Sequence, residues 1–420
     1  MNVSKSKFAV MGVAAALSSV AAAETMDRPS GIKIGQRMTL RPYVSMSATY
    51  DSNVFGRNGG GSGKTDDVMW TINPGLGLDY RAENWSALLS AYYNYRAYCQ
   101  KRYYDNYNQH SFGETFRWNW SNSKGAEKGW SLMLTETFSQ ITMADDISMS
   151  DGRDYTADRR QLSVQGAVQR RFNEHWHSEL GASYYNLDYM NDTDNAYALY
   201  GWQRWTANWS AGYAPSRWTD FLVNLGYQGY TQENVANSRY SRDSQGFTAQ
   251  VGLGSYATER ISYRALVGWS RFEYANDSDS VDGFVYTLSG NWKISDTWNT
   301  MLLASSYYQP SERELGARSR VDSVSWGLGK SLVRGKLRAT LDLTYRRETQ
   351  EYAFYEGYDY TLDVLSGRVG LDYTLNRFMA LFAYAEYLRS WNDESNVGYY
   401  GSRYGDYDRW RVTGGVRFTY

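Results

Sequence analysis

The chain has 420 residues, a formal net charge of −1 and 16% aromatic residues, among them 39 Tyr and 16 Trp. Its nearly balanced charge argues against a broad electrostatic surface for nucleic acid, so we predict no nucleic-acid partner. No stretch approaches ~18 consecutive apolar residues, which excludes membrane-spanning helices. The mean hydropathy of −0.62 would suit a soluble protein, but membrane barrels reach similar values because only alternate strand residues face lipid.

Residues 1–23 are predicted to be a secretory signal peptide. Lys5 and Lys7 give a basic start, an apolar run covers 8–20, and Ala23 ends a small-residue cleavage site. Residues 24–37 are too few to fold alone and are predicted to be a short periplasmic segment. We predict that 38–420 forms a single barrel in the bacterial outer membrane, with membrane lipid as its surroundings.

Polar and apolar residues alternate in segments of a length that suits tilted membrane strands. Val68, Trp70 and Ile72, for example, alternate with Met69 and Thr71, as in a strand whose successive side chains point to opposite faces. The pattern predicts an all-β, antiparallel, up-and-down transmembrane barrel of about 18 strands (16–18). The expected strands are 38–52, 67–80, 85–99, 107–120, 129–142, 159–172, 175–189, 201–214, 218–231, 244–256, 260–274, 283–294, 298–310, 320–332, 336–350, 358–374, 378–392 and 409–420.

Short turns and long polar loops alternate between these strands. An even strand number places all short turns on one side, which is the periplasmic side in outer-membrane barrels. Aromatic residues gather at strand ends, as expected for rings at the two membrane interfaces. We predict a girdle with Trp prominent at the turn side, namely Trp85, Trp130, Trp176, Trp218 and Trp298, and a Tyr girdle at the loop side.

Two strands break the alternation, because Glu114 and Glu136 fall in phase with apolar neighbours. Either a bulge or a different register in those strands would explain this.

The last eleven residues, from Trp410, have one apolar face and one polar face and end in the aromatic Tyr420. This ending resembles the signal by which bacterial outer-membrane barrels are recognised for insertion. The resemblance implies that the barrel-assembly machinery is a partner, through Tyr420.

A barrel of this size leaves an aqueous channel. Alternation predicts that the following residues line the lumen: Arg41, Arg96, Arg204, Arg264, Lys293, Arg338, Asp342, Arg346, Arg411 and Arg417. Few acidic residues are expected beside them, and a basic lumen would favour anions or acidic sugars. Alternatively, the arginines pair with loop carboxylates and merely fill the barrel.

Catalytic and metal-binding patterns are weak. His175 and His177 form a His-x-His pair without an evident third ligand, and they follow a turn on the periplasmic side. His110 and Ser111 are adjacent on a strand and therefore point to opposite faces, which prevents a nucleophile–base pair. Cys99 is alone, so no internal disulfide can form. We predict no catalytic residue, no metal and no cofactor.

The segment from Leu40 to Phe55, which contains Tyr50, Asp51 and Asn53, resembles the opening strand of the β-barrel porin type 2 family. That resemblance implies an outer-membrane barrel of a kind often associated with exopolysaccharide loci, with no established catalytic residues to carry over. The leading hypothesis is a porin-like channel for passive passage of polar solutes, including saccharides or an exported exopolysaccharide. The alternative is a non-conducting structural or binding barrel whose extracellular loops contact glycans or partners.

Overall fold

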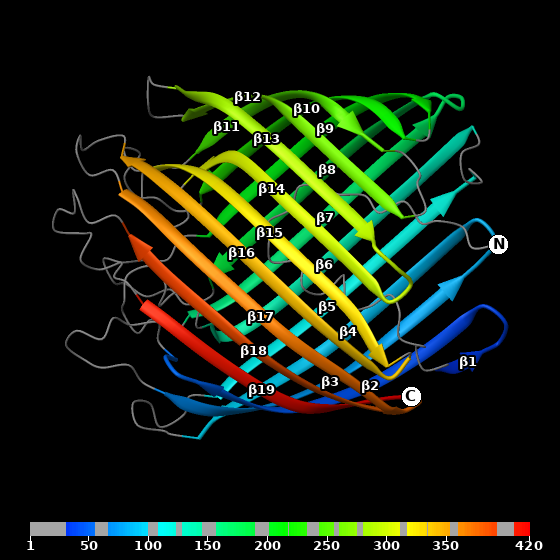
Figure 1. Ribbon diagram of the computed structural model, residues 1–420, viewed down its shortest axis with the longest axis vertical. Coiled ribbons are helices and arrows are strands. Elements are labelled where there is room, and N and C mark those ends of the chain that lie inside the picture. Colours follow the sequence, from blue (N-terminus) through cyan, green and yellow to red (C-terminus); the bar gives the residue numbers. More distant parts are fainter. Residues whose placement is uncertain are drawn as a thin grey trace.

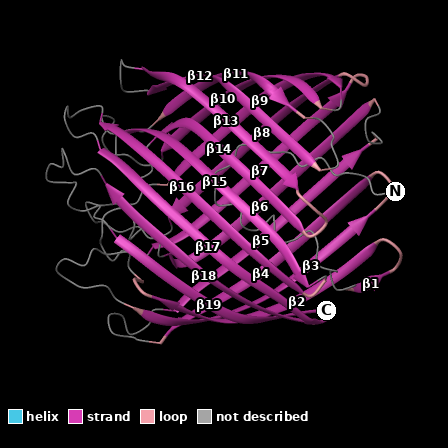
Figure 2. Cartoon of the chain, in the orientation of Figure 1, coloured by secondary structure: helices cyan, strands magenta, loops and turns pink. Residues whose placement is uncertain are grey.

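The computed structural model describes residues 31–54, 66–99, 108–122, 128–144, 157–189, 201–216, 218–232, 243–255, 260–274, 280–310, 317–333, 335–352, 360–392 and 407–420. Regular structure in these residues consists of tilted strands (Figure 2). In the described residues, there is no helix with the length and apolar character needed to cross a membrane.

The strands form one antiparallel sheet that closes on itself (Figure 1). Of its 19 strands, β2 to β19 form a closed ring of 18, in which β19 pairs with β2. The predicted barrel is therefore confirmed. Its strands are β2 (Met38–Asp51), β3 (Asp67–Arg81), β4 (Trp85–Tyr98), β5 (Asn108–Ser121), β6 (Gly129–Ala144), β7 (Ala157–Arg171), β8 (Trp176–Tyr189), β9 (Trp202–Ser216), β10 (Thr219–Gln232), β11 (Ser244–Gly254), β12 (Ile261–Tyr274), β13 (Ser280–Lys293), β14 (Trp298–Pro310), β15 (Ala317–Val333), β16 (Leu337–Tyr352), β17 (Tyr360–Asn376), β18 (Met379–Asn392) and β19 (Tyr407–Thr419).

A further short strand, β1 (Ile32–Ile34), was not predicted from the sequence. It forms a hairpin with the start of β2, where Lys33 lies opposite Thr39. Gly35 in the turn has a φ of 67°, a conformation that glycine adopts without a steric penalty. β1 and β19 pair with the same edge of β2. The pairing with β19 ends where the C-terminal residue Tyr420 donates its N–H to the carbonyl of Pro42, at 3.1 Å. β1 pairs with the residues of β2 that precede this point.

The two ends of the barrel differ. At one end, called the turn rim here, short turns join the strands, and one of them is closed by a backbone bond of 2.8 Å from Ala82 to Trp85. β1 and the C-terminus lie at the same end (Figure 1). The opposite end, where β2 finishes, is called the loop rim here. In outer-membrane barrels the short turns face the periplasm, so the turn rim is the periplasmic end and the loop rim the extracellular end.

The outer face of the ring is an apolar belt. Trp70, Leu180 and Val251 each expose more than half of their surface on it. Such large exposed apolar residues suit a surface that contacts hydrocarbon. A closed ring also satisfies the backbone hydrogen bonds that lipid would leave unmade, each at a cost of several kcal/mol. These features are those of an outer-membrane barrel.

The inner face is identified by side chains that meet across several strands. The amide of Gln228 on β10 donates to the carbonyl of Tyr308 on β14. Arg264 on β12 interacts electrostatically with Glu179 on β8. Side chains four strands apart meet only on the concave side of a ring, so these residues define the interior.

The predicted division of the aromatic girdles is wrong in part. Trp85, Trp176 and Trp218 are exposed at the turn rim, as expected. However, Trp205 and Trp410 are also exposed near the loop rim. Both membrane interfaces offer a headgroup layer in which an amphipathic ring is stable, so tryptophan is not confined to one of them.

Neither explanation offered for Glu114 and Glu136 is correct. Glu114 lies opposite Phe138 and Glu136 opposite Phe116, and the β5–β6 ladder has no register shift there. Both carboxylic acids therefore lie in the middle of the outer face, half-buried beside phenylalanine rings. Acidic residues are tolerated on the lipid face of barrels better than basic ones.

Candidate functional site: the barrel interior

The ten residues predicted to line the lumen all occupy inward positions in the strand register. All ten lie within strands, and three of them are at the turn rim, where Lys293 ends β13, Arg338 is the second residue of β16 and Arg417 is near the end of β19. Lys293 is drawn toward the turn by an ion pair with Asp296 at 3.0 Å. The register of neighbouring strands fixes these positions for Arg41, Arg96, Arg204, Arg264, Lys293, Arg338, Asp342, Arg346, Arg411 and Arg417.

Several of the inward arginines have carboxylate partners in the wall itself. Arg41 lies 3.4 Å from Asp79, and Arg346 lies 2.9 Å from Glu348. The further inward pair Arg368–Glu386 spans β17 and β18 at 3.5 Å. The interior is therefore a surface of paired charges rather than an array of free cations.

Four of the acidic wall residues were not predicted from the sequence: Glu179, Asp220, Glu348 and Glu386. Arg264 interacts electrostatically with both Glu179 and Asp220. Extending the alternation along β8 and β16 would have found Glu179 and Glu348, because each is in phase with a polar residue two positions away. Asp220 and Glu386 have only apolar or aromatic residues at those positions, so alternation gave no such signal for them. The predicted alternative had assigned the partners to the loops, whereas these partners lie in the strands.

Hydroxyl groups pair across neighbouring strands on the same inner face. These pairs are Thr49–Thr413 at 2.8 Å, Ser183–Thr206 at 2.7 Å, Thr248–Ser270 at 2.9 Å, Ser305–Ser323 at 3.0 Å and Ser325–Thr344 at 3.0 Å. Each hydroxyl keeps lone pairs beyond the one that such a bond uses. The wall between the charged pairs can therefore exchange hydrogen bonds with a neutral solute.

Aromatic rings also lie on the inner face, flat against the wall. A β-carbon on Gly75 would collide with the ring of Tyr43, and one on Gly113 would collide with the ring of Tyr92. Each glycine therefore leaves the space in which its neighbour's ring lies. Because the rings lie along the wall, they take little of the bore.

Two further inner rings are paired with arginines. The guanidinium of Arg368 lies 4.0 Å from the ring centre of Tyr384, and that of Arg417 lies 5.4 Å from the ring centre of Phe382. Cations over ring faces are favourable contacts. We call Tyr43, Tyr92, Phe382 and Tyr384 the ring strip, since they follow the inner wall from β18 across β19 to β4.

The three histidines bond to different partners. His177 bonds to Asp220 at 2.8 Å, whereas His175 bonds to the carbonyl of Ala214. His110 is on the outer face beside Tyr93, and Ser111 is buried on the inner face. No group of three or more metal-binding side chains occurs in the part of the chain that the structure describes.

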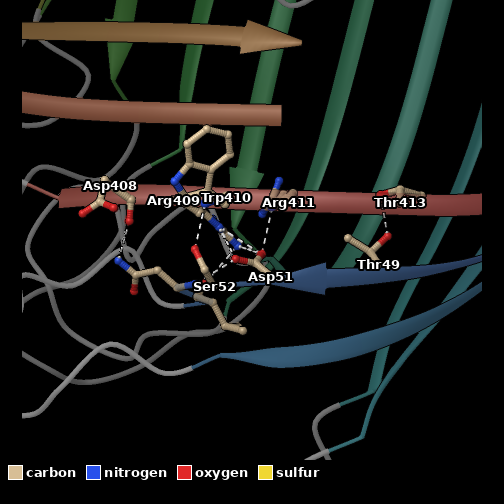
Figure 3. Close-up of polar contacts among 10 residues, drawn as sticks. Thr49, Asp51, Ser52, Asp408, Arg409, Trp410, Arg411 and Thr413 are labelled. Carbon is tan, nitrogen blue, oxygen red and sulfur yellow. Dashed lines mark hydrogen bonds and ion pairs between the residues drawn. The ribbon is translucent and has the colours of Figure 1, made fainter. Parts of the chain in front are cut away.

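The first and last strands are fastened at the loop rim by a buried ion cluster, called the clasp here (Figure 3). Asp51 is fully buried, and it accepts bonds of 2.8 Å from Nε of both Arg409 and Arg411. Asn53 extends the clasp by donating its side-chain amide to the carbonyl of Asp408 at 3.2 Å. The partners of Asp51 on β19 were not predicted from the sequence.

The predicted signal peptide at 1–23 lies outside the described ranges, and so do long loops on which the binding alternative depends, such as the one that contains 399–404.

Comparison with known proteins shows a likeness in fold. No family model matches the chain, and no curated protein matches it in sequence. The FrpB iron transporter of Neisseria meningitidis (F5-1 variant, apoprotein form) is 9% identical, with a TM-score of 0.48 over 92% of this chain and 82% of that one. The siderophore receptor PirA of Pseudomonas aeruginosa is 7% identical, with a TM-score of 0.44 over 93% of this chain and 81% of that one.

The outer membrane protein OpdK of Pseudomonas aeruginosa is 13% identical, with a TM-score of 0.43 over 91% of this chain and 99% of that one. At these identities the likeness concerns the barrel fold and extends to nothing finer. The resemblance to the β-barrel porin type 2 family stays a prediction.

Proposed function

We propose that this protein is a non-enzymatic channel through which polar solutes, saccharides foremost, cross the outer membrane passively. The observation that carries the proposal is the chemistry of the inner wall, where hydroxyl pairs alternate with paired charges around a closed ring of 18 strands. Rings of this size leave an aqueous bore. A small bore filled with apolar side chains would have favoured a structural role instead.

The ring strip favours saccharides among polar solutes. Tyr43, Tyr92, Phe382 and Tyr384 are half-buried, so part of each ring remains accessible on the inner face. A sugar has apolar C–H faces and polar hydroxyl edges, which match an aromatic face next to hydroxyl and guanidinium groups. Arg368 and Arg417, which lie beside the strip, supply donors for the solute's oxygens.

The paired charges bear on selectivity. An arginine that faces a wall carboxylate contributes less to the net field in the bore than a free arginine does. We therefore expect weaker anion selectivity than a lumen of unpaired arginines would give.

Single-channel recording in a planar bilayer tests the proposal. We expect discrete conductance steps from the purified protein and a small anionic reversal potential in a salt gradient. Replacing Gly75 with Leu should lower the conductance, because the new side chain displaces the ring of Tyr43 into the bore.

Gly414→Leu is the matched control, since Gly414 faces outward and has nothing within 4 Å of an added β-carbon. A bilayer that stays electrically sealed would remove the channel proposal. A strong cation preference would remove the assigned selectivity.

A further inference from the structure

The joint between β13 and β14 is incomplete toward the loop rim. Its ladder runs from Lys293 opposite Asn299 to Tyr286 opposite Ser306, where it ends. β13 nevertheless continues to Ser280 along β12, and β14 continues to Pro310 along β15. The two strands therefore separate in the half of the wall nearer the loop rim, while each stays paired with its other neighbour.

The separated ends overlap, with the tip of β14 on the inner side of β13. The hydroxyl of Tyr308 on β14 lies where a β-carbon on the inward-facing Gly283 of β13 would be. It packs in a buried cluster with Val285 of β13 and Phe272 of β12, which are each 1% exposed. A side chain of β14 can reach the inner face of two preceding strands only if the tip of β14 crosses behind β13.

The overlap is held by side chains instead of a backbone ladder. Beyond the apolar cluster, the amide of Gln228 on β10 donates to the carbonyl of Tyr308 at 3.3 Å. Elsewhere in a membrane barrel, the ladder supplies the backbone bonds that lipid cannot. A joint held by side-chain contacts needs fewer interactions to be broken than a joint held by a ladder.

The joint is apolar where the two strands overlap. Phe272, Val285 and Tyr308 form a buried apolar patch there, and the hydroxyl pair Thr248–Ser270 lies next to it along β12. Directly beside it on the outer face, Phe284 is 49% exposed toward the lipid side. On the β15 side the joint is bordered by the ion pair Arg320–Asp322, at 3.1 Å. Apolar surface thus continues from the interior, through the overlap, to the membrane-facing belt, beside a charged edge.

We propose that the β13–β14 joint is a lateral exit, by which an amphipathic solute carrying an apolar tail or ring leaves the interior for the outer leaflet. The apolar part passes between the overlapping strands when Tyr308 withdraws from its cluster, and the polar part follows along Arg320 and Asp322. The passage of a solute depends on the proposed channel. The opening of the wall does not, so the two are tested separately.

Thiol labelling from the bilayer tests the opening. In a Cys99→Ser background, Val285→Cys is combined with either the native Tyr308 or Tyr308→Ala, and the protein is placed in vesicles. The probe is hexadecyl methanethiosulfonate, which stays in the hydrocarbon. We expect Tyr308→Ala to increase the labelling rate at position 285 roughly tenfold, because the population of the open joint rises.

Val364→Cys on β17 is the matched control. Val364 faces the interior, in the half of β17 nearer the loop rim. It is paired on both sides, opposite Arg346 of β16 and Ser390 of β18. It should stay unlabelled from the bilayer whether or not Tyr308 is present. Equal labelling at positions 285 and 364 in the Tyr308→Ala protein would overturn the lateral exit.

Gln228→Ala supplies a second test in case Tyr308→Ala does not fold. It removes the hydrogen bond to the Tyr308 carbonyl and leaves the apolar cluster in place, so a smaller increase at position 285 is expected. Heat-dependent gel mobility shows whether this variant is folded. If it is folded and labelling at position 285 does not increase, the result would also count against the exit. Conductance of the same samples reports on the channel independently of the labelling.

Discussion

The β19–β2 and β13–β14 joints close the same ring in opposite ways. β19 and β2 are the chain's last and nearly first strands, and no turn connects them. Their ladder runs from Thr419 opposite Tyr43 to Arg411 opposite Asp51, where the clasp adds a buried ion cluster. β13 and β14 are joined by a turn at Ser295, and their ladder stops in mid-wall.

The difference shows that either a connecting turn or side-chain contacts can hold two neighbouring strands of a barrel together. A hairpin turn holds β13 and β14 together at the turn rim, so their halves nearer the loop rim can separate while the ring stays closed at the turn rim. The β19–β2 joint has no such tether, and its separation would expose two strand edges to lipid along the whole wall. Its strongest side-chain contacts lie at the loop rim, far from the point where Tyr420 reaches β2.

Removing the clasp should have the largest effect on stability. Asp51→Ala leaves the buried guanidinium of Arg409 without its carboxylate, which costs about 3–5 kcal/mol of unfolding free energy. Urea unfolding in lipid vesicles, followed by tryptophan fluorescence, measures the loss.

Glu273→Ala is the control, because Glu273 and its partner Arg271 are both exposed and an exposed pair contributes about 1 kcal/mol or less. Equal losses in the two variants would mean that the clasp is no stronger than an ordinary rim ion pair.

Breaking the other joint should cost less than breaking the clasp. Tyr308→Ala removes a buried ring from the cluster with Phe272 and Val285, with an expected loss of about 3 kcal/mol. Tyr373→Ala, which removes a ring that is 40% exposed on the outer face, should change the unfolding free energy less. The comparison between the joints fails if Tyr308→Ala destabilises the barrel more than Asp51→Ala does.

Hydroxyl pairs should contribute equally at the β19–β2 joint and at an ordinary hairpin joint such as β15–β16. Thr413→Val removes a bond to Thr49 and should cost about 1 kcal/mol. Ser325→Ala, which removes the bond to Thr344 in the fully paired β15–β16 joint, should cost a similar amount. A much larger loss for Thr413→Val would show that the clasp depends on its hydroxyl neighbour.

The last residue should also have a small effect on folded stability. Deleting Tyr420 removes its stacking on Phe378, a contact of about 0.5–1.5 kcal/mol, together with its backbone bond to Pro42. If the C-terminal aromatic is also the insertion signal, the amount of folded barrel in the outer membrane should fall severalfold. Phe378→Ala removes the same stacking but keeps the C-terminus. Equal reductions in both variants would contradict the role assigned to Tyr420.

Alternation along the chain was enough to predict the ring, because lipid on one side and water on the other impose a period of two on every strand. That period also placed residues such as Arg41 and Arg264 on the inner face. It failed for Glu114 and Glu136, whose outward position violates the pattern without any irregularity of the backbone.

Contacts between distant strands could not be predicted in the same way. The clasp joins residues 358 positions apart, and the Gln228–Tyr308 bond joins strands that are not neighbours. Both contacts depend on how the ring closes and on where its strands overlap. The alternation of residues along one strand gives no information about either. For the same reason, the sequence indicated the basic residues of the interior but not which carboxylates partner them.

The measurement that tests the account most directly is the swelling of protein-containing vesicles in isotonic solutions of neutral saccharides. A polar interior predicts rapid swelling with a monosaccharide and progressively slower swelling as the saccharide lengthens. Swelling no faster than that of protein-free vesicles, even with the smallest sugar, would contradict the channel.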